Sequence, residues 1–514
     1  MPHFLYRYLK NDLHNLTSYF VKMIIKKIYL LIPTLLLVSI LLFQFSCGDD
    51  AIPIPPNTET ENENPEGKVA VWRSDQAGLI KLAKEPTLLP YETVTDADVN
   101  ITIEEGTAYQ TMEGFGAALT HSSAFVIQTH LEEAEQNQLL EDLFDTENGI
   151  GISYIRLTIG ASDFSIADFT YNDLAAGESD IAQNNFNLSM EDEYLIPLLQ
   201  KILTINPAIK IMASPWSAPA WMKENETLKG GGHLKTDFQA SYANYFIKYI
   251  QAMEAKNIPI HAITIQNEPL YAAPYISMEM SAAEQKSFIR DHLGPQFEAN
   301  NITTKIIIYD HNWDDINYPL EILNDAATKP YIAGTAFHCY AGDVSAMSQV
   351  YNAHPDAGIY FTECSGGDFA PDYGANLSWN SENLLMGATR NWAKAVLFWN
   401  LALDENSGPK NGGCDDCRAV VTINSSTKTV TKNEEYVLLG HITKFVQSGA
   451  KRIETRNARG EDISQVAFKN PTGSIVVVVF NHKEEPQKVQ FQYQQDDFNY
   501  EIESGMLATF VIEN

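Results

Sequence analysis

The chain has 514 residues, of which 45% are hydrophobic and 11% aromatic, enough apolar side chains for a large folded domain with a smaller companion. Its 66 acidic and 35 basic residues give a formal net charge of −31 at pH 7. This charge repels phosphate, which argues against nucleic acid as a partner and leaves neutral substrates such as sugars open.

Residues 1–47 have the pattern of an export signal. A basic start, at Met1 or at Met23, is followed by an apolar run over 28–45, a small residue and Cys47. An uncleaved anchor helix is the alternative, because the run is just long enough to span a bilayer. The end of the run is similar to bacterial lipoprotein signals, in which Cys47 becomes the lipid-bearing N-terminus. We therefore expect a lipid anchor, membrane attachment through it, and a cell-envelope location as an outer-membrane or surface lipoprotein.

Two segments separate this signal from the main folded part. Residues 48–68 are rich in Pro, Asn and acidic residues and contain almost nothing to bury, which predicts a disordered tether. Residues 69–110 contain short strand-like stretches at 69–72 and 99–103. We expect these strands to join the sheet formed by the C-terminal residues.

Eight short apolar runs lie within residues 111–444, and each ends on polar or glycine residues. Stretches with helical spacing lie between several of them. Apolar strands that alternate with helices argue for a parallel sheet covered on both faces, and eight repeats argue for closure into a (β/α)8 TIM barrel of the α/β class. A doubly wound open sheet is the competing fold, but no glycine-rich phosphate fingerprint follows a strand. The runs cover 112–120, 154–160, 209–216, 261–269, 305–312, 334–340, 358–365 and 395–404.

The fourth and seventh runs end in glutamates, Glu268 in "QNEP" and Glu363 in "TECS". Their spacing matches three βα units of roughly 30 residues each, and strand ends form the open face of such a barrel. A facing pair at about 5 Å suits retaining glycoside hydrolysis, whereas a wider pair would indicate inversion. A single glutamate at a strand end is more often a cap or an ion-pair partner.

Aromatic residues fall at the same strand ends, among them Trp216, Tyr340 and Trp399. The apolar faces of sugar rings stack on aromatic planes, while Asn, His and Asp bind hydroxyl groups. An aromatic residue at such a position is otherwise part of the core. The pattern therefore favours a carbohydrate as the substrate.

The last part of the chain and the cysteines suggest further structure. Residues 445–514 show alternating strands with turn signals, which predicts a β-sandwich. Cys414 and Cys417 in "GGCDDCR" favour a local disulfide over free thiols or a metal site, since no second pair has zinc-ligand spacing. Cys339 and Cys364 lie within apolar runs, where buried free thiols are favoured.

These motifs together resemble glycoside hydrolase family 30, the family of lysosomal glucosylceramidase and fungal β-1,6-glucanases. The resemblance covers residues 70–514 and implies a catalytic (β/α)8 barrel with a fused β-sandwich, a retaining mechanism, and neither cofactor nor metal. The motifs that carry it are "EGFGAALT", "YIRLTIGASDFSIADFTYND", "ASPWSAPAWMK", "ITIQNEP", "FHCY", "YFTECSGG", "WNLALDENSGP" and "GSIVVVVFN".

The resemblance implies a role for each residue of a substrate site. Glu268 would be the acid and base, Glu363 the nucleophile, and Asn267 the partner of the sugar's 2-hydroxyl. Trp216 and Trp399 would line the subsite for the non-reducing sugar.

Three further residues follow from the same comparison. Tyr340 would lie near the nucleophile, and His338 would support the acid. Where glucosylceramidase-like members carry an Asp that binds sugar hydroxyls, this chain has His121. A neutral imidazole is a weaker partner than a carboxylate, so we expect His121 to bind substrate without strict specificity for terminal glucose.

The sequence thus predicts a retaining β-glycoside hydrolase that acts on β-linked glucans or glucosides, as a β-1,6-glucanase or a glucosylceramidase-like enzyme. Its expected partners are a carbohydrate and, through the lipid anchor, a membrane. A surface glycan-binding protein on an inactive barrel is the alternative from another class, which the retention of both glutamates disfavours. A metal-dependent hydrolase is the third possibility.

Overall fold

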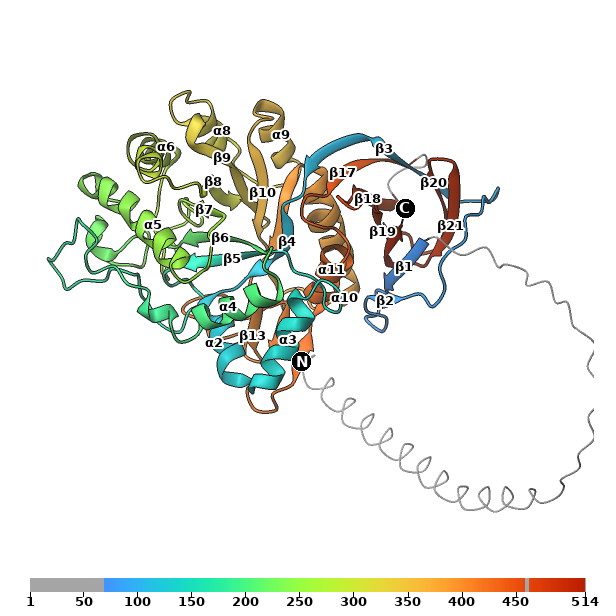
Figure 1. Ribbon diagram of the computed structural model, residues 1–514, viewed down its shortest axis with the longest axis horizontal. Coiled ribbons are helices and arrows are strands. Elements are labelled where there is room, and N and C mark those ends of the chain that lie inside the picture. The colour runs from blue at the N-terminus through green and yellow to red at the C-terminus, as the bar shows by residue number, and fades with distance from the viewer. Residues whose placement is uncertain (1–68, 458–461, 514) are drawn as a thin grey trace, which may run out of the picture. The chain divides into compact units, whose positions relative to one another are not determined.

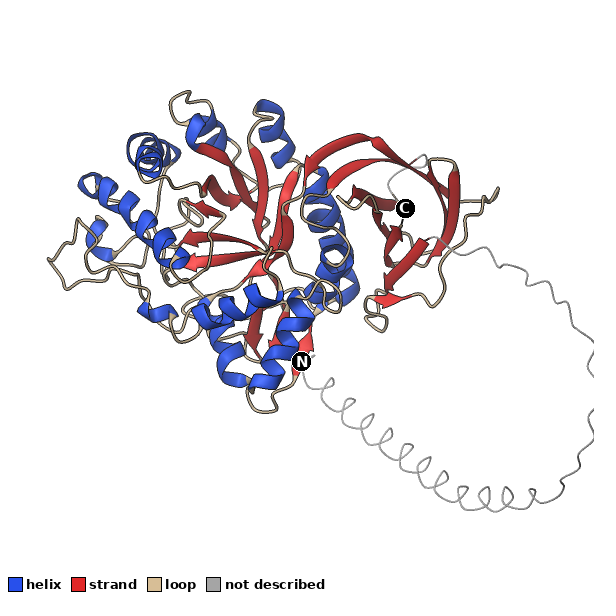
Figure 2. Cartoon of the chain, viewed as in Figure 1, coloured by secondary structure: helices blue, strands red, loops and turns tan. Residues whose placement is uncertain are grey.

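The computed structural model describes residues 69–457 and 462–513. The expected signal with Cys47 and the expected tether lie outside the described residues. The described chain contains a closed barrel with helices around it and a separate sheet built from strands alone (Figure 1, Figure 2). Within these ranges, no helix is long and apolar enough to cross a bilayer.

Eight parallel strands form the barrel, each paired with the next along the chain, and the last one pairs with the first. The predicted fold is therefore confirmed, and each of the eight apolar runs overlaps one barrel strand. The strands are β4 (Gly114–Ala118), β5 (Tyr154–Ile159), β6 (Lys210–Pro215), β7 (Ala262–Thr264), β8 (Lys305–Asn312), β9 (Ile332–His338), β10 (Gly358–Glu363) and β12 (Ala393–Phe398).

Helices lie around the outside of these strands (Figure 1). Several of them begin at side-chain caps; for example, Thr120 accepts a hydrogen bond from the backbone N–H of Ser123, and Ser281 forms a capping box with Glu284. The α-helices are α2 (His121–His130), α3 (Glu133–Phe144), α4 (Leu195–Ile205), α5 (Gln239–Glu254), α6 (Ala282–Phe288), α7 (Gly294–Ala299), α8 (Asn317–Leu323), α9 (Ala346–Ala353), α10 (Tyr373–Asn380) and α11 (Glu434–Thr443). The 3-10 turns are η1 (Ser189–Glu191), η2 (Ala220–Met222), η3 (Thr236–Phe238) and η5 (Lys329–Tyr331), and two π-helical segments are η4 (Ile289–Leu293) and η6 (Ser381–Ala388).

Both ends of the described chain contribute to the nine-stranded sheet. β1 pairs with β22, and β3 pairs with both β17 and β20. Its strands are β1 (Val69–Ser74), β2 (Ala83–Lys84), β3 (Val99–Thr111), β17 (Lys451–Asn457), β18 (Ile463–Lys469), β19 (Ile475–Asn481), β20 (Gln487–Tyr493), β21 (Asp496–Ile502) and β22 (Leu507–Ile512). Two small sheets near the barrel contain β11 (Gly366–Gly367), β13 (Ala402–Asp404), β14 (Cys417–Arg418), β15 (Val421–Ile423) and β16 (Val430–Lys432).

A buried carboxylate closes the amino-terminal end of the barrel. Glu113 is 5% exposed, and its carboxylate lies 2.7 Å from Lys305 Nζ, 2.9 Å from Lys394 Nζ and 3.0 Å from His261 Nε2. Burial raises the pKa of Glu113, but the hydrogen bonds and charges of these residues outweigh burial and hold that pKa well below its usual range. Glu113 therefore stays ionised.

The structure corrects one prediction about the cysteines. Cys339 and Cys364 are not free thiols: they form a disulfide that joins the segments just after β9 and β10. Both arrangements are buried and apolar, so the hydrophobic pattern could not separate them. Cys414 and Cys417 are also paired with each other.

Candidate active site

A cavity of about 750 Å³ opens at the carboxyl-terminal face of the barrel, because its lining residues follow barrel strands. The lining contains five carboxyl groups and neither lysine nor arginine. The lining residues are Asp163, Phe164, Glu268, Leu270, Tyr271, Tyr275, His311, Asn312, Asp314, Asp315, Tyr340, Glu363, Ser365, Phe369, Trp399, Cys414 and Cys417.

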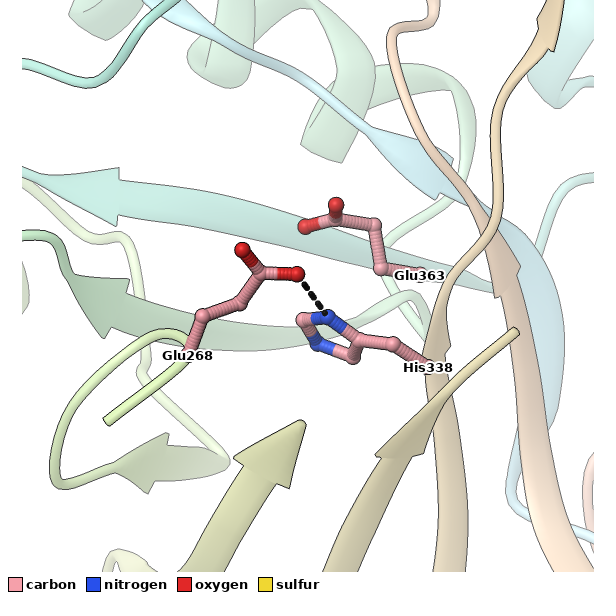
Figure 3. Close-up of side chains that lie close together, drawn as sticks. All are labelled: Glu268, His338 and Glu363. Carbon is pink, nitrogen blue, oxygen red and sulfur yellow. Dashed lines mark hydrogen bonds and ion pairs between the residues drawn. The ribbon is translucent and has the colours of Figure 1, made fainter. Parts of the chain in front are cut away.

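Glu268 and Glu363 face each other in this cavity (Figure 3). Glu363 is the last residue of β10, and Glu268 lies in the turn after β7 with φ of 45°, a backbone conformation that is uncommon outside glycine. One carboxyl oxygen of each lies within 4.8 Å of the other and of a nitrogen of His338. Retaining glycosidases place their carboxyl groups about 5–5.5 Å apart, and inverting ones about 6.5–9.5 Å. The separation therefore suits retention.

Arg156 in β5 is fully buried and contacts three polar groups of the site. Its guanidinium donates to Glu363 Oε2 at 2.5 Å, to Asn267 Oδ1 at 2.7 Å and to Asp310 Oδ2 at 2.8 Å. A planar guanidinium with several donors holds such acceptors at fixed angles. Arg156 thus fixes the positions of Glu363 and Asn267 together.

His338 at the end of β9 bridges two carboxyl groups. Its Nδ1 lies 3.2 Å from Glu268 Oε1 (Figure 3), and its Nε2 lies 3.1 Å from Asp310 Oδ1. Burial lowers the pKa of His338, but the charge of Glu363 and the hydrogen bonds to Asp310 and Glu268 outweigh burial and raise that pKa to about 9. His338 is therefore a cation at neutral pH that donates from both nitrogens.

The charges of this cluster leave one proton to be shared. The carboxyl groups of Asp310, Glu268 and Glu363 face two cations, Arg156 and His338. Burial raises the pKa of Asp310, but Arg156 and His338 hold it well below its usual range, so Asp310 is ionised. The cluster is then neutral when one of the two glutamates carries a proton.

Local contacts bias where that proton lies. Burial, with the charge of Glu268, raises the pKa of Glu363 against the opposing effects of His338 and Arg156. Burial also raises the pKa of Glu268, but the hydrogen bond from His338 outweighs it and lowers that pKa. These contacts favour the proton on Glu363 when the cavity is empty. Double displacement needs one ionised and one protonated carboxyl with the proton on the acid, so the proton has to pass to Glu268 before the reaction.

Glu268, His338 and Glu363 are also residue types that bind metal ions. However, both nitrogens of His338 are engaged by carboxylates, and the Arg156 guanidinium adjoins Glu363. A divalent cation would have to share these oxygens with two protein cations, which disfavours it electrostatically.

Other residues expected at the site lie at different depths. Tyr340 donates its hydroxyl to Glu363 Oε1 at 2.9 Å, and Trp399 lines the cavity. Trp216 does not line it; its ring stacks on Trp399 with centroids 5.3 Å apart and lies 5.0 Å from the Arg156 guanidinium. Trp216 therefore supports the position of Trp399 from behind.

The structure corrects the expectation for His121. Its side chain is buried, packs edge-on against Phe169 and Tyr194, and does not line the cavity. Burial lowers the pKa of His121 to about 4, so the imidazole is neutral. Asp163, which follows β5, contributes a carboxyl group to the lining. Its backbone carbonyl accepts a hydrogen bond from the N–H of Asn411 at 2.6 Å.

Among the site residues that were not predicted, Arg156, Asp310 and Asp163 each have a signal in the sequence. Arg156 in "YIRLTIG" and Asp310 in "KIIIYDHN" are charged residues within otherwise apolar barrel strands, a placement that needs a buried partner. Asp163 follows the second run in "GASDF", at a strand end like the two glutamates.

Comparisons with known proteins agree with this geometry. The family model described as the glycosyl hydrolase family 30 TIM-barrel domain matches residues 112–446, and that of the family 30 beta sandwich domain matches 449–510. An endo-1,6-β-D-glucanase of Neurospora crassa is 35% identical over 388 residues, or 72% of this chain and 79% of that protein. The lysosomal acid glucosylceramidase of Mus musculus is 29% identical over 421 residues, or 76% and 79%. A solved endo-β-1,6-glucanase structure superposes with a TM-score of 0.82 and 34% identity, covering 87% of this chain and 100% of the other.

Proposed function

The chain belongs to glycoside hydrolase family 30 and is a retaining β-glycoside hydrolase, and from this premise we propose that its substrate is a β-1,6-linked glucan. The Neurospora crassa relative named for this polymer shares 35% identity with the chain, against 29% for the mouse glucosylceramidase. The cavity lining supports a neutral sugar, because five carboxyl groups without a lysine or arginine would repel a uronic acid. Endo action is part of the proposal, since the relatives named for β-1,6-glucan are endo-enzymes.

The observation that carries the mechanism is the glutamate pair within 4.8 Å. In our proposal Glu363 attacks the anomeric carbon and forms a glycosyl ester, while Glu268 protonates the departing oxygen. Glu268 then takes a proton from water, whose oxygen displaces Glu363 and restores the original configuration.

The shared proton fits this sequence of steps. The resting and reactive forms differ only in which glutamate carries the proton, since His338 stays protonated in both. Positive charge that develops at the anomeric carbon favours ionised Glu363, which leaves the proton to Glu268. Arg156 and Tyr340 hold the two oxygens of Glu363 while this happens.

Product analysis on defined β-glucans tests the substrate. We expect β-1,6-linked oligosaccharides from a β-1,6-glucan, with the β-anomer released first by NMR. Cleavage of β-1,3- or β-1,4-glucan in preference to the β-1,6-linked polymer would refute the substrate. Glycan binding without hydrolysis of any substrate would instead favour the binding-protein alternative, which both retained glutamates disfavour.

Chemical rescue tests the two roles. Glu268→Ala should keep turnover of substrates with good leaving groups and be accelerated by azide to give a β-glycosyl azide. Glu363→Ala with azide should give the α-linked product. The reverse pattern would exchange the roles.

We also propose that the protein is an envelope lipoprotein anchored at Cys47. The support is the basic start, the apolar run and the small residue before this cysteine. Expression in a bacterium with labelled fatty acid should label the wild type and not Cys47→Ala. An unlabelled wild type would contradict the anchor.

A further inference from the structure

The cavity holds a second group of residues that the glutamate pair does not use. On the wall that carries Glu268, the turn after β7 presents Leu270 and Tyr271, and the end of β8 presents His311. The two segments are joined, because the backbone N–H of Glu268 donates to the carbonyl of Asp310 at 3.0 Å. We infer that His311 and Tyr271 bind the sugar on the leaving-group side of the scissile bond, an inference that rests on the proposed function.

The position of the acid supports this assignment. The acid touches the oxygen of the leaving group, so residues beside it meet the leaving sugar first. Asp163 and Trp399 belong to other strand ends, those after β5 and β12. The wall that carries Glu268 is therefore the one next to the departing sugar.

His311 is a buried polar side chain with an unmet hydrogen-bonding requirement. It lines the cavity and is 9% exposed, and its Nδ1 has no hydrogen-bond partner among the described residues. A buried polar atom without a partner costs free energy, and such atoms in native proteins call for a ligand or another explanation. Nδ1 itself is enclosed by protein atoms, so the part of the imidazole that lines the cavity is the part that a sugar hydroxyl would meet.

The backbone before His311 is held in an unfavourable shape. Tyr309 and Asp310 have φ values of 70° and 66°, and the pairing of β8 with β9 shifts register between Tyr309 and His311. Consecutive non-glycine residues rarely adopt this left-handed conformation, and bulges beside active sites re-aim side chains. The distortion turns Asp310 toward Arg156 and brings His311 to the cavity wall.

Tyr271 supplies an apolar surface beside the imidazole. It is 46% exposed, and its backbone N–H donates to the carbonyl of Glu268 at 3.0 Å, which fixes its turn relative to the acid. Exposed aromatic rings at a cavity mouth stack on the faces of sugar rings. In a β-1,6 bond the leaving oxygen is carried by the exocyclic C6, so the leaving ring lies farther from the acid than in other linkages. An aromatic residue at the mouth, rather than at the floor, matches that reach.

Kinetics with two leaving groups test the inference. We expect His311→Ala and Tyr271→Ala to lower the ratio of kcat/KM on a β-1,6-linked glucotriose to kcat/KM on 4-nitrophenyl β-glucoside by roughly 10- to 100-fold, because only the first substrate has a leaving sugar. His311→Gln should restore part of the ratio, since its amide still hydrogen bonds. Trp379→Ala is the control for Tyr271, because Trp379 is 45% exposed and does not line the cavity.

A transfer assay gives a second measurement that does not depend on the natural linkage. With the aryl glucoside as donor and a panel of disaccharides as acceptors, the acceptor hydroxyl replaces water and forms a new glycoside. His311→Ala should lower the ratio of transfer to hydrolysis. If wild type cleaves β-1,6 bonds but both ratios are unchanged in the variants, the inference fails alone. If wild type cleaves no β-1,6 bond, the proposed substrate fails, and the transfer ratio still decides the role of His311.

Discussion

The two ends of the barrel surround buried carboxylates with opposite balances of charge. At the amino-terminal end, Glu113 alone faces Lys305, Lys394 and a histidine. At the carboxyl-terminal end, Glu268, Glu363 and an aspartate share two cations. An excess of cations fixes one charge and stabilises the fold. Where there is one cation fewer than there are carboxylates, one carboxyl group keeps a proton. That proton can move between carboxyl groups, which acid and base catalysis needs.

The largest expected effect comes from the carboxyl-terminal end of the barrel, which holds Glu268 and Glu363. Glu363→Gln should lower kcat on 4-nitrophenyl β-glucoside by about 10,000-fold or more, because an amide cannot form the glycosyl ester. Thermal unfolding should show that the variant is folded. Turnover near that of wild type would refute the role of Glu363.

At the amino-terminal end of the barrel, which holds Glu113, a substitution should lower stability and leave kcat unchanged. Glu113→Gln should lower the free energy of unfolding by about 3–5 kcal/mol, because Lys305 and Lys394 lose their shared partner. Urea unfolding at constant m-value measures it. Asp356→Asn is the matched control: its ion pair with Lys329 is exposed and should contribute less than about 1 kcal/mol. An equal effect of both changes would contradict the contrast between the two ends.

The disulfides allow a finer test of the catalytic end. Replacing Cys339 and Cys364 by serine should cost about 3 kcal/mol of stability, because the bond closes a loop across 25 residues. It should also lower kcat, since these cysteines adjoin His338 and Glu363 in the chain. The same change at Cys414 and Cys417, three residues apart, should cost less stability. Equal costs in urea unfolding would count against the loop argument.

The stabilising effects of His338 and Glu113 should each be confined to a particular pH range. The pKa of His338 is raised from 6.5 to about 9, so its stabilisation is full below pH 6.5 and is lost as pH rises through 9. The pKa of Glu113 is lowered from 4.5, so its stabilisation is present above pH 4.5 and is lost as pH falls. The unfolding free energy of the wild type should therefore approach that of His338→Gln as pH rises through 9. It should approach that of Glu113→Gln as pH falls below 4.5. Parallel curves would contradict the assignment.

The barrel could be predicted because its strands are buried on both sides and appear as continuous apolar runs. Glu268 and Glu363 were recognisable because each breaks such a run at its end. The partners of Arg156 could not be recognised in the same way. Asp310 and Glu363 come from distant strands, and local sequence does not show which charges meet in the barrel interior.

Two errors have a common physical origin. Strand ends from different parts of the chain converge at one face, so sequence alone did not show that Asp163 lines the cavity and that His121 does not. The bond between Cys339 and Cys364 could have been deduced. They follow the sixth and seventh barrel strands, and neighbouring parallel strands end side by side.

The position of β22 governs when the accessory sheet can assemble. This strand lies between β1 and β19, so the first and last described strands are hydrogen-bonded partners. A nascent chain therefore cannot pair β1 in its native place until residue 512 has left the ribosome. We expect the edge of β1 that pairs with β22 to stay unpaired throughout synthesis. A chaperone could bind this edge during that period.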